Sequence, residues 1–141
     1  MIKDVLLTPL NVIDTAGGSV MHAMKASSLG YEGFGEAYFS KIDSGAIKAW
    51  KRHERMTLNI IVPKGKIRFI LFDDRDFHNI QIQEIIISKD NYCRLTVPPM
   101  IWMGFQGVDN DSMLLNIANI EHDPNEVDNK NIENIDFNWG E

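Results

Sequence analysis

Short runs of alternating apolar and polar residues dominate the chain between Gly35 and Asn119. The runs are rich in Val, Ile, Phe and Thr, and turn residues separate them at the spacing typical of β-sandwiches and β-barrels. Their lengths suit strands better than helices. The pattern predicts an all-β core with strands at Glu36–Ile42, Ala46–Trp50, Thr57–Val62, Lys66–Phe72, Ile80–Ser88, Cys93–Val97 and Met113–Ile117.

Proline and glycine mark the connections between these strands. The segment Pro63–Lys66 predicts a tight hairpin turn, because Pro fixes one φ and Gly65 adopts the positive φ that other residues resist. Pro98 and Pro99 cannot donate to a sheet ladder, so we expect them to end a strand and to lead the chain across a barrel rim.

After Ile120 the composition changes to Asp, Asn and Glu, which is typical of a disordered tail. The apolar residues spaced along it, which end in Trp139, favour instead a short helix or arm docked on the core. We therefore predict one domain over residues 1–141, with a core at about 10–120 and a C-terminal arm at 121–141. A chain of 141 residues can bury such a core without disulfides or a structural metal.

Charge and cysteine content exclude several classes of protein. The net charge of -6 disfavours a nucleic-acid or anionic-membrane surface. The single cysteine, Cys93, cannot form an internal disulfide and is expected to be a buried, inert thiol. The first apolar run is broken by Pro9 and is too short for a secretion signal or a membrane span, which predicts a cytoplasmic protein.

A basic cluster stands out in this acidic chain. Lys48, Lys51, Arg52, His53 and Arg55 fall within eight residues. Such a cluster either attracts an anionic ligand, for example a small phosphate compound, or is the solvated connection between two strands. Lys51 and His53 share one face if the strand continues, because side chains alternate with a period of two.

Three segments and the terminal Trp139 resemble the dTDP-4-dehydrorhamnose 3,5-epimerase family and, more closely, its shorter cupin relatives. The segments are FGEAYFSKIDSGAIKAWKRHERMTLNIIVPKGKIRFILFDDR, SKDNYCRLTVPPMIWMGFQG and DSMLLNIANIEHDPNE. The resemblance covers roughly residues 10–139. It implies an all-β, cupin-type double-stranded β-helix (a jelly-roll barrel), usually a homodimer, whose mouth holds the sugar of a nucleoside-diphosphate sugar.

The resemblance also implies a reaction, which is proton abstraction next to a 4-keto group with epimerisation at C3, C5 or both. The family's catalytic histidine falls at Lys51 here, and His53 follows two residues later. Position favours Lys51 as the base, whereas chemistry favours His53, which starts nearer the useful pKa. Asp136 is the candidate for the carboxylate that orients the base. Asn116 occupies the place of a tyrosine that acts as the acid on the opposite face.

Other residues are candidates for binding the substrate. Lys48 matches a binding cation of the family's first strand, and Arg52 and Arg68 are predicted to contact phosphate. Trp102 could stack on a base or sugar, or only plug the end of the barrel. Tyr38 could supply a phenolic acid, or pack in the core or at the rim.

We expect neither a metal nor a cofactor. Many cupins bind a metal through several histidines and a glutamate, but the basic segment offers only His53 and Glu54, which alternate faces on a strand. Three functions stay open. The leading one is a nucleotide-sugar epimerase. The others are a keto-isomerase of the same pathway, which needs only one base, and an altered cupin that binds a sugar nucleotide or a partner enzyme without chemistry.

Overall fold

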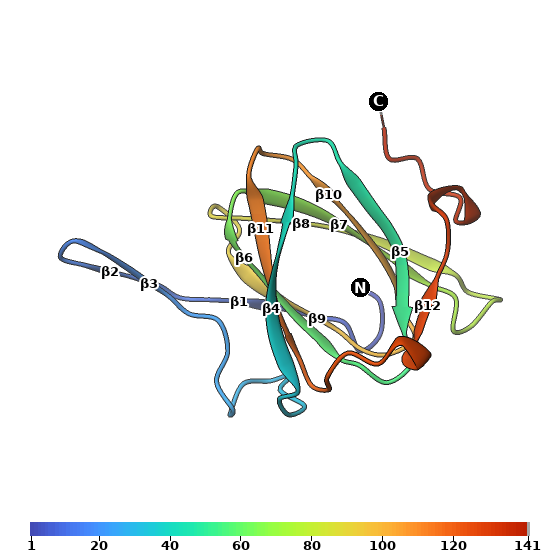
Figure 1. Ribbon diagram of the computed structural model, residues 1–141, viewed down its shortest axis with the longest axis horizontal. Helices are drawn as coiled ribbons and strands as arrows, with labels where there is room; N and C mark the ends of the chain where they lie inside the picture. Colours follow the sequence, from blue (N-terminus) through green and yellow to red (C-terminus); the bar gives the residue numbers. More distant parts are fainter. Residues whose placement is uncertain (141) are drawn as a thin grey trace.

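The computed structural model describes residues 1–140, which form twelve strands and two short 3₁₀ helices (Figure 1). The elements in chain order are β1 (Leu6–Pro9), β2 (Val12–Thr15), β3 (Gly18–Met21), β4 (Glu36–Ile42), β5 (Ile47–His53), β6 (Leu58–Lys64), β7 (Lys66–Asp73), β8 (Gln81–Ser88), β9 (Cys93–Val97), β10 (Trp102–Gly107), β11 (Ser112–Ala118), η1 (Pro124–Glu126), β12 (Val127–Asn129) and η2 (Ile132–Asn134).

Two five-stranded antiparallel sheets face each other. The first sheet has the strand order β1-β9-β6-β11-β4, and the second has the order β12-β5-β10-β7-β8. From β4 to β12 the chain changes sheet at every connection except the β7–β8 hairpin. This crossing pattern is that of a jelly-roll barrel, so the predicted cupin-type fold is confirmed.

The core fills the space between the sheets. On β9 the side chains of Cys93, Leu95 and Val97 point into it, as the period of two requires. Burial raises the pKa of the Cys93 thiol, which fits the predicted inert cysteine. Ile2 and Val5 also belong to this core, so the core begins before residue 10.

All seven predicted strands are present, with ends that differ by up to three residues. The largest difference is at β5, which continues to His53 because β12 pairs with its last residues. The pattern missed five strands, which are short, polar or interrupted by glycine: β1, β2, β3, β10 and β12.

The predicted hairpin at Pro63–Lys66 is wrong. β6 and β7 lie in different sheets, so the chain turns a corner here. Gly65 does adopt a positive φ of 82°, and a Cβ at this position would lie 2.3 Å from the Ser112 hydroxyl. The turn chemistry was therefore predicted correctly, but local sequence does not show which sheet the next strand joins. Pro98 and Pro99 do follow the end of β9 and lead to β10 in the other sheet.

The C-terminal segment docks on the outer face of the second sheet, to the right of β5 in Figure 1. Ile135 and Trp139 are buried there against Trp50, Ile70 and Trp102. The Trp50 indole N–H donates to the Ile132 carbonyl at 3.1 Å. The prediction of a docked arm is confirmed, and the apolar residues in the acidic segment are its anchors.

The β2–β3 ribbon projects away from the barrel (Figure 1). Most of its residues are exposed, including Val12, Ile13 and Val20. None of the residues that the structure describes belongs to a helix long and apolar enough to cross a membrane.

Candidate active site

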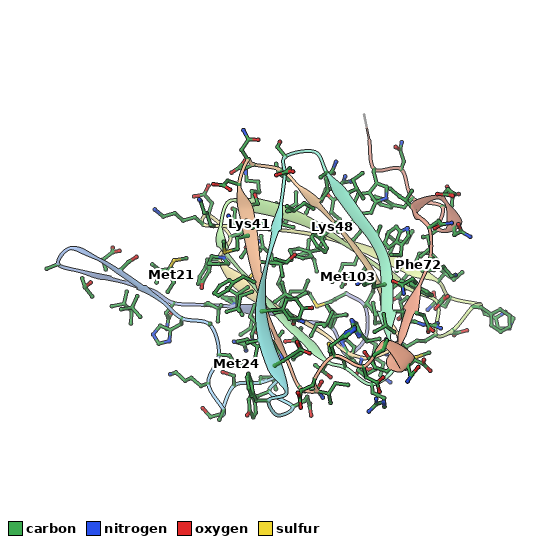
Figure 2. All side chains as sticks on the ribbon, in the orientation of Figure 1. Met21, Met24, Lys41, Lys48, Phe72 and Met103 are labelled. Atoms are coloured by element: carbon green, nitrogen blue, oxygen red, sulfur yellow. The ribbon has the colours of Figure 1, made fainter. Side chains whose placement is uncertain are left out.

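A cavity of about 430 Å³ lies between the two sheets. β4, β6 and β11 of the first sheet form one wall, and β5, β10 and the β12 segment of the second sheet form the other. Figure 2 shows Lys48 and Met103, two of its lining residues, in the space between β4 and β5. The lining residues are Tyr38, Ser40, Lys48, Ala49, Trp50, Lys51, His53, Leu58, Ile60, Met103, Phe105, Leu114, Asn116, Asn129 and Lys130.

A β-bulge in β5 brings Lys48 to the same wall as Lys51 and His53. Met103 pairs with Lys51, but Phe105, two residues further along β10, pairs with Lys48, so β5 contains one extra residue. A regular strand would place residues 48 and 51 on opposite faces. Because of the bulge, both lysines lie opposite cavity-lining residues of β10.

His53 is held by a buried carboxylate. Its Nδ1 lies 2.5 Å from Oε1 of Glu126, whose residue is only 2% exposed. Oε2 of Glu126 accepts the backbone N–H groups of Arg55 at 3.0 Å and Met56 at 3.2 Å. The carboxylate therefore fixes the imidazole ring with Nδ1–H as the donor, and Nε2 is left as the basic nitrogen.

Hydrogen bonding keeps Glu126 ionised. Burial alone would raise its pKa, but hydrogen bonds from His53 and from the amides of Arg55 and Met56 outweigh burial and lower the pKa below its ordinary value. An ionised Glu126 also stabilises the imidazolium that forms when His53 takes up a proton. This pair has the geometry of a general base with an orienting carboxylate.

The structure corrects the predicted orienting carboxylate. Asp136 is exposed on the C-terminal arm, and the residue that contacts His53 is Glu126. Asp123 caps η1 by accepting the Asn125 N–H at 2.9 Å, and Val127 pairs with His53 across β12 and β5. The motif DPNEV, a capped turn followed by a strand residue, was the signal in the sequence that could have found Glu126.

Every charged residue among the lining residues is basic, although the chain carries a net charge of -6. Lys48 donates to the Lys41 carbonyl at 3.2 Å, and no acidic group within residues 1–140 forms an ion pair with Lys48 or Lys51. Lys130 differs, because its ammonium lies 4.8 Å from the centre of the Trp102 ring. The cavity therefore offers unpaired positive charge to an anionic ligand.

Arg52 and Trp102, both predicted to bind substrate, lie outside the cavity. Arg52 forms a hydrogen-bonded ion pair with Asp128 at 2.7 Å and lies 4.7 Å from the Trp102 ring centre. Trp102 is buried in the outer cluster beneath the arm. Residue 52 alternates with residues 51 and 53, so it points away from the cavity.

Arg68, a third predicted substrate contact, also lies elsewhere. It pairs with Glu84 at 2.6 Å and donates to the Trp139 carbonyl at 2.8 Å, so it fastens the C-terminal arm to the outer face of the second sheet. The basic segments thus contain two kinds of cation. Those on the outer face of the sheet are structural, and those on the inner face line the cavity.

Asn116 lies in the cavity as predicted, and its neighbour is Tyr38. The two residues are directly paired across β11 and β4, and Asn116 Nδ2 donates to the Tyr38 hydroxyl at 3.1 Å. Asn116 is 2% exposed, and its Oδ1 has no hydrogen-bond partner. A buried acceptor without a partner costs free energy, so this oxygen is suited to a hydroxyl of a bound ligand.

Within residues 1–140, no three His, Cys, Asp or Glu side chains are grouped so that they could hold a metal ion. The site that emerges is a jelly-roll cavity with a carboxylate-paired histidine, two unpaired lysines and an apolar floor. These features suit an anionic, partly apolar ligand, in a cupin-type cavity that holds a histidine paired with a carboxylate.

Comparisons with known proteins agree with this class, although no family model matches the chain. The crystal structure of a dTDP sugar isomerase from Desulfovibrio desulfuricans superposes with a TM-score of 0.92 and 32% identity, over 97% of this chain and 91% of that one. The probable low-salt glycan biosynthesis epimerase Agl13 of Haloferax volcanii is 28% identical over 93% of this chain and 87% of its own length.

A more distant structure shares the fold. The sugar 3,4-ketoisomerase QdtA from Thermoanaerobacterium thermosaccharolyticum, solved in complex with TDP, has a TM-score of 0.78 and 16% identity, over 94% of this chain and 92% of that one. The chain belongs to the cupin family of dTDP-sugar epimerases and isomerases. It is an enzyme of the sugar-nucleotide epimerase or keto-isomerase class.

Proposed function

We propose that this enzyme epimerises or isomerises a 4-keto sugar nucleotide, and that His53 removes a proton from the carbon next to the ketone. The observation that carries the proposal is the His53–Glu126 pair in a cavity whose charged lining is basic. A C–H bond beside a carbonyl is acidic enough for a histidine base when the resulting enolate is stabilised.

The lysines supply that stabilisation and bind the substrate. Lys51 lies two residues before His53 on the same wall, which supports a role for its ammonium in stabilising the enolate oxygen at C4. Lys48, on the other side of the bulge, is the cation that we assign to the diphosphate. In this proposal His53 is the base and Lys51 is its cationic neighbour, and the carboxylate partner of His53 supports that choice between the two candidates.

The rest of the cavity suits the uncharged part of the substrate. The free Oδ1 of Asn116 can accept from a sugar hydroxyl, and the ring of Phe105 offers an apolar face for the sugar. The floor, formed by Leu58, Ile60 and Leu114, is apolar and would exclude water from the enolate.

The test is proton NMR in deuterium oxide with dTDP-4-keto-6-deoxyglucose as the probe. We expect the C3 or C5 proton signal to disappear as solvent deuterium replaces it, and we expect His53→Asn to slow this exchange by about 10³-fold. Arg52→Gln is the matched control, since it removes a cation of the same strand from the outer face. Binding shifts without exchange in the wild type would refute the proposal and would support a cupin that only binds.

The homodimer is a further part of this proposal. An isolated two-stranded ribbon is at best marginally stable in water, yet β2 and β3 project from the barrel with Val12, Ile13 and Val20 exposed. Phe34 and Phe39 are also exposed, the latter on β4, the edge strand of the first sheet. We propose that a second copy covers these apolar surfaces.

Light scattering of the wild type and of Ile13→Asp tests this assembly. We expect the wild type to have twice the mass of one chain and the variant to be a monomer, because a buried charge at the interface is costly. A monomeric wild type would contradict it.

A cytoplasmic location also belongs to the proposal, and the unpaired thiol of Cys93 supports it. The proposal further treats the whole chain as one domain, which is supported by a single core that runs from Ile2 to Ala118.

A further inference from the structure

We propose that a second cavity, outside the candidate active site, binds a phosphate ion. This cavity has a volume of about 210 Å³ and lies on the outer face of the first sheet, at the root of the β2–β3 ribbon. Figure 2 labels Met24, one of its lining residues, in the chain that leads away from the ribbon. The two cavities share no lining residue. Sites for drug-sized ligands begin at roughly 300 Å³, so the second cavity fits one small ion and not a nucleotide sugar.

The floor of the second cavity is formed by β1 and β9. Arg94 alternates on β9 with Cys93 and Leu95, which point into the core, so its side chain lies on the opposite face of the sheet. It is paired with Thr8 of β1, which also lines the cavity. The segment 22–29 covers the guanidinium, and Arg94 is only 1% exposed. A permanent positive charge is therefore buried at the base of the cavity.

Arg94 lacks a partner for its charge. A guanidinium has five N–H groups. The two terminal nitrogens donate to the carbonyls of Ala23 at 2.8 Å and Leu29 at 3.0 Å, whereas Nε is buried without a hydrogen-bond partner. No acidic group within residues 1–140 forms an ion pair with Arg94, and burial lowers its pKa. The two carbonyls fasten the covering segment but do not neutralise the charge, which leaves Arg94 suited to an anion.

The other polar lining residues indicate the same kind of ligand. His22 and Lys25 add two basic groups, and no acidic residue of the described chain lines the cavity. Neither of the two forms an ion pair with a carboxylate of residues 1–140. The hydroxyl oxygen of Ser28 accepts the backbone N–H of Lys25 at 2.9 Å, which leaves the hydroxyl hydrogen free for an oxyanion. Phosphate suits this set better than a carboxylate, because it carries more negative charge and more acceptor oxygens.

A bound phosphate would join the sheet to the segment that covers it. Arg94 belongs to β9, whereas His22, Lys25 and Ser28 belong to the covering segment. An ion held from both sides stabilises this segment by mass action, and with it the attachment of the β2–β3 ribbon to the barrel. The site is therefore distinct from catalysis in both its residues and its effect.

Isothermal titration calorimetry with sodium phosphate at constant ionic strength tests the site. The titrated protein is the full chain with Lys48→Gln and Lys51→Gln, because these substitutions remove the unpaired cations of the candidate active site, where phosphate would also bind. We expect one phosphate per chain. In this background, Arg94→Met should weaken binding by at least about tenfold and Lys25→Gln by a few-fold. Lys89→Gln, which removes an exposed lysine outside both cavities, is the matched control and should change nothing.

Several results would overturn the site. One is the absence of phosphate binding in the background protein, and another is full retention of binding by folded Arg94→Met. Sodium acetate is titrated in parallel, and tighter binding of acetate than of phosphate would overturn the choice of ligand. Circular dichroism shows whether Arg94→Met is folded, since it also loses two hydrogen bonds to the covering segment. If it is not folded, unchanged binding by Lys25→Gln overturns the site. Deuterium exchange by the wild type tests the proposed function separately.

Discussion

The two faces of β5 carry similar residues in different surroundings. On the inner face, Lys48 and Lys51 have no acidic partner among residues 1–140 and His53 has one buried carboxylate. On the outer face, Arg52 is paired with Asp128 and Trp50 is packed against the arm. The positive charge on one face is neutralised within the chain, and on the other it is left for a ligand.

This difference teaches how to separate structural cations from binding cations in one basic cluster. The identity of the residue is a poor guide, since arginine is the usual phosphate contact and here the arginine is structural. The partner on the neighbouring strand decides the role. Substitutions on the outer face should therefore change stability, and those on the inner face should change chemistry.

The largest effect on stability is expected from the outer face. Trp139→Ala removes a buried indole that packs against Trp50 with ring centroids 5.3 Å apart. We expect the free energy of unfolding to fall by about 3 kcal/mol, measured by urea denaturation. The variant should keep its exchange rate at low denaturant, and a loss of catalysis in the folded variant would show that the two faces are not independent.

Glu126→Gln should have the next largest effect, on the inner face. A neutral amide cannot stabilise the imidazolium and can hold the wrong tautomer of His53, so we expect exchange to slow by about 10²-fold. The measurement is the deuterium exchange rate at saturating substrate. Asp136→Asn is the matched control, because this carboxylate is exposed on the arm, and a comparable loss in this control would restore Asp136 as a candidate.

The same pair predicts a dependence of stability on pH. The pKa of Glu126 is lower in the folded chain than the value of about 4.3 of an unfolded glutamate, so as the pH falls the unfolded state takes up the proton first. The stabilisation is complete well above pH 4.3 and is lost as the pH falls through the folded pKa. Urea unfolding at several pH values should show the wild type and Glu126→Gln converging below about pH 4.

Lys51→Gln should have a smaller effect, of about tenfold on exchange. One cation is removed from a cavity that keeps Lys48 and His53, so the enolate loses part of its stabilisation. The dependence of the rate on salt should weaken in the variant, since salt screens the charge that was removed. An unchanged salt dependence would indicate that Lys51 does not meet the substrate.

Arg52→Gln is expected to have the smallest effect. Its ion pair with Asp128 is partly exposed, and such pairs contribute about 1 kcal/mol or less to stability. Thermal melting should therefore shift by only a few degrees, with no change in the rate of exchange. A loss of activity larger than that of Lys51→Gln would reverse the assignment of the two faces.

The sequence predicted the barrel and part of its cavity, for a physical reason. Alternation of apolar residues locates strands such as β9, and a period of two places Lys51 and His53 together. Two features could not be read in this way. The bulge depends on the register with β10, and the contact of Glu126 with His53 joins residues 73 positions apart. The predicted substrate contacts of Arg52, Arg68 and Trp102 are wrong, because the role of each residue depends on the face of the sheet that its side chain occupies. Strand pairing sets that face.

The bulge in β5 has a consequence for how the site can change over time. The extra residue lies between Lys48 and Lys51, so its loss would leave the two lysines two positions apart in a regular strand, both still facing the cavity, with β10 unchanged. A single outward residue would then stand where this chain has Ala49 and Trp50. A homologue one residue shorter at this point can therefore keep the same charged wall, and the change would fall on the outer face that receives the C-terminal arm.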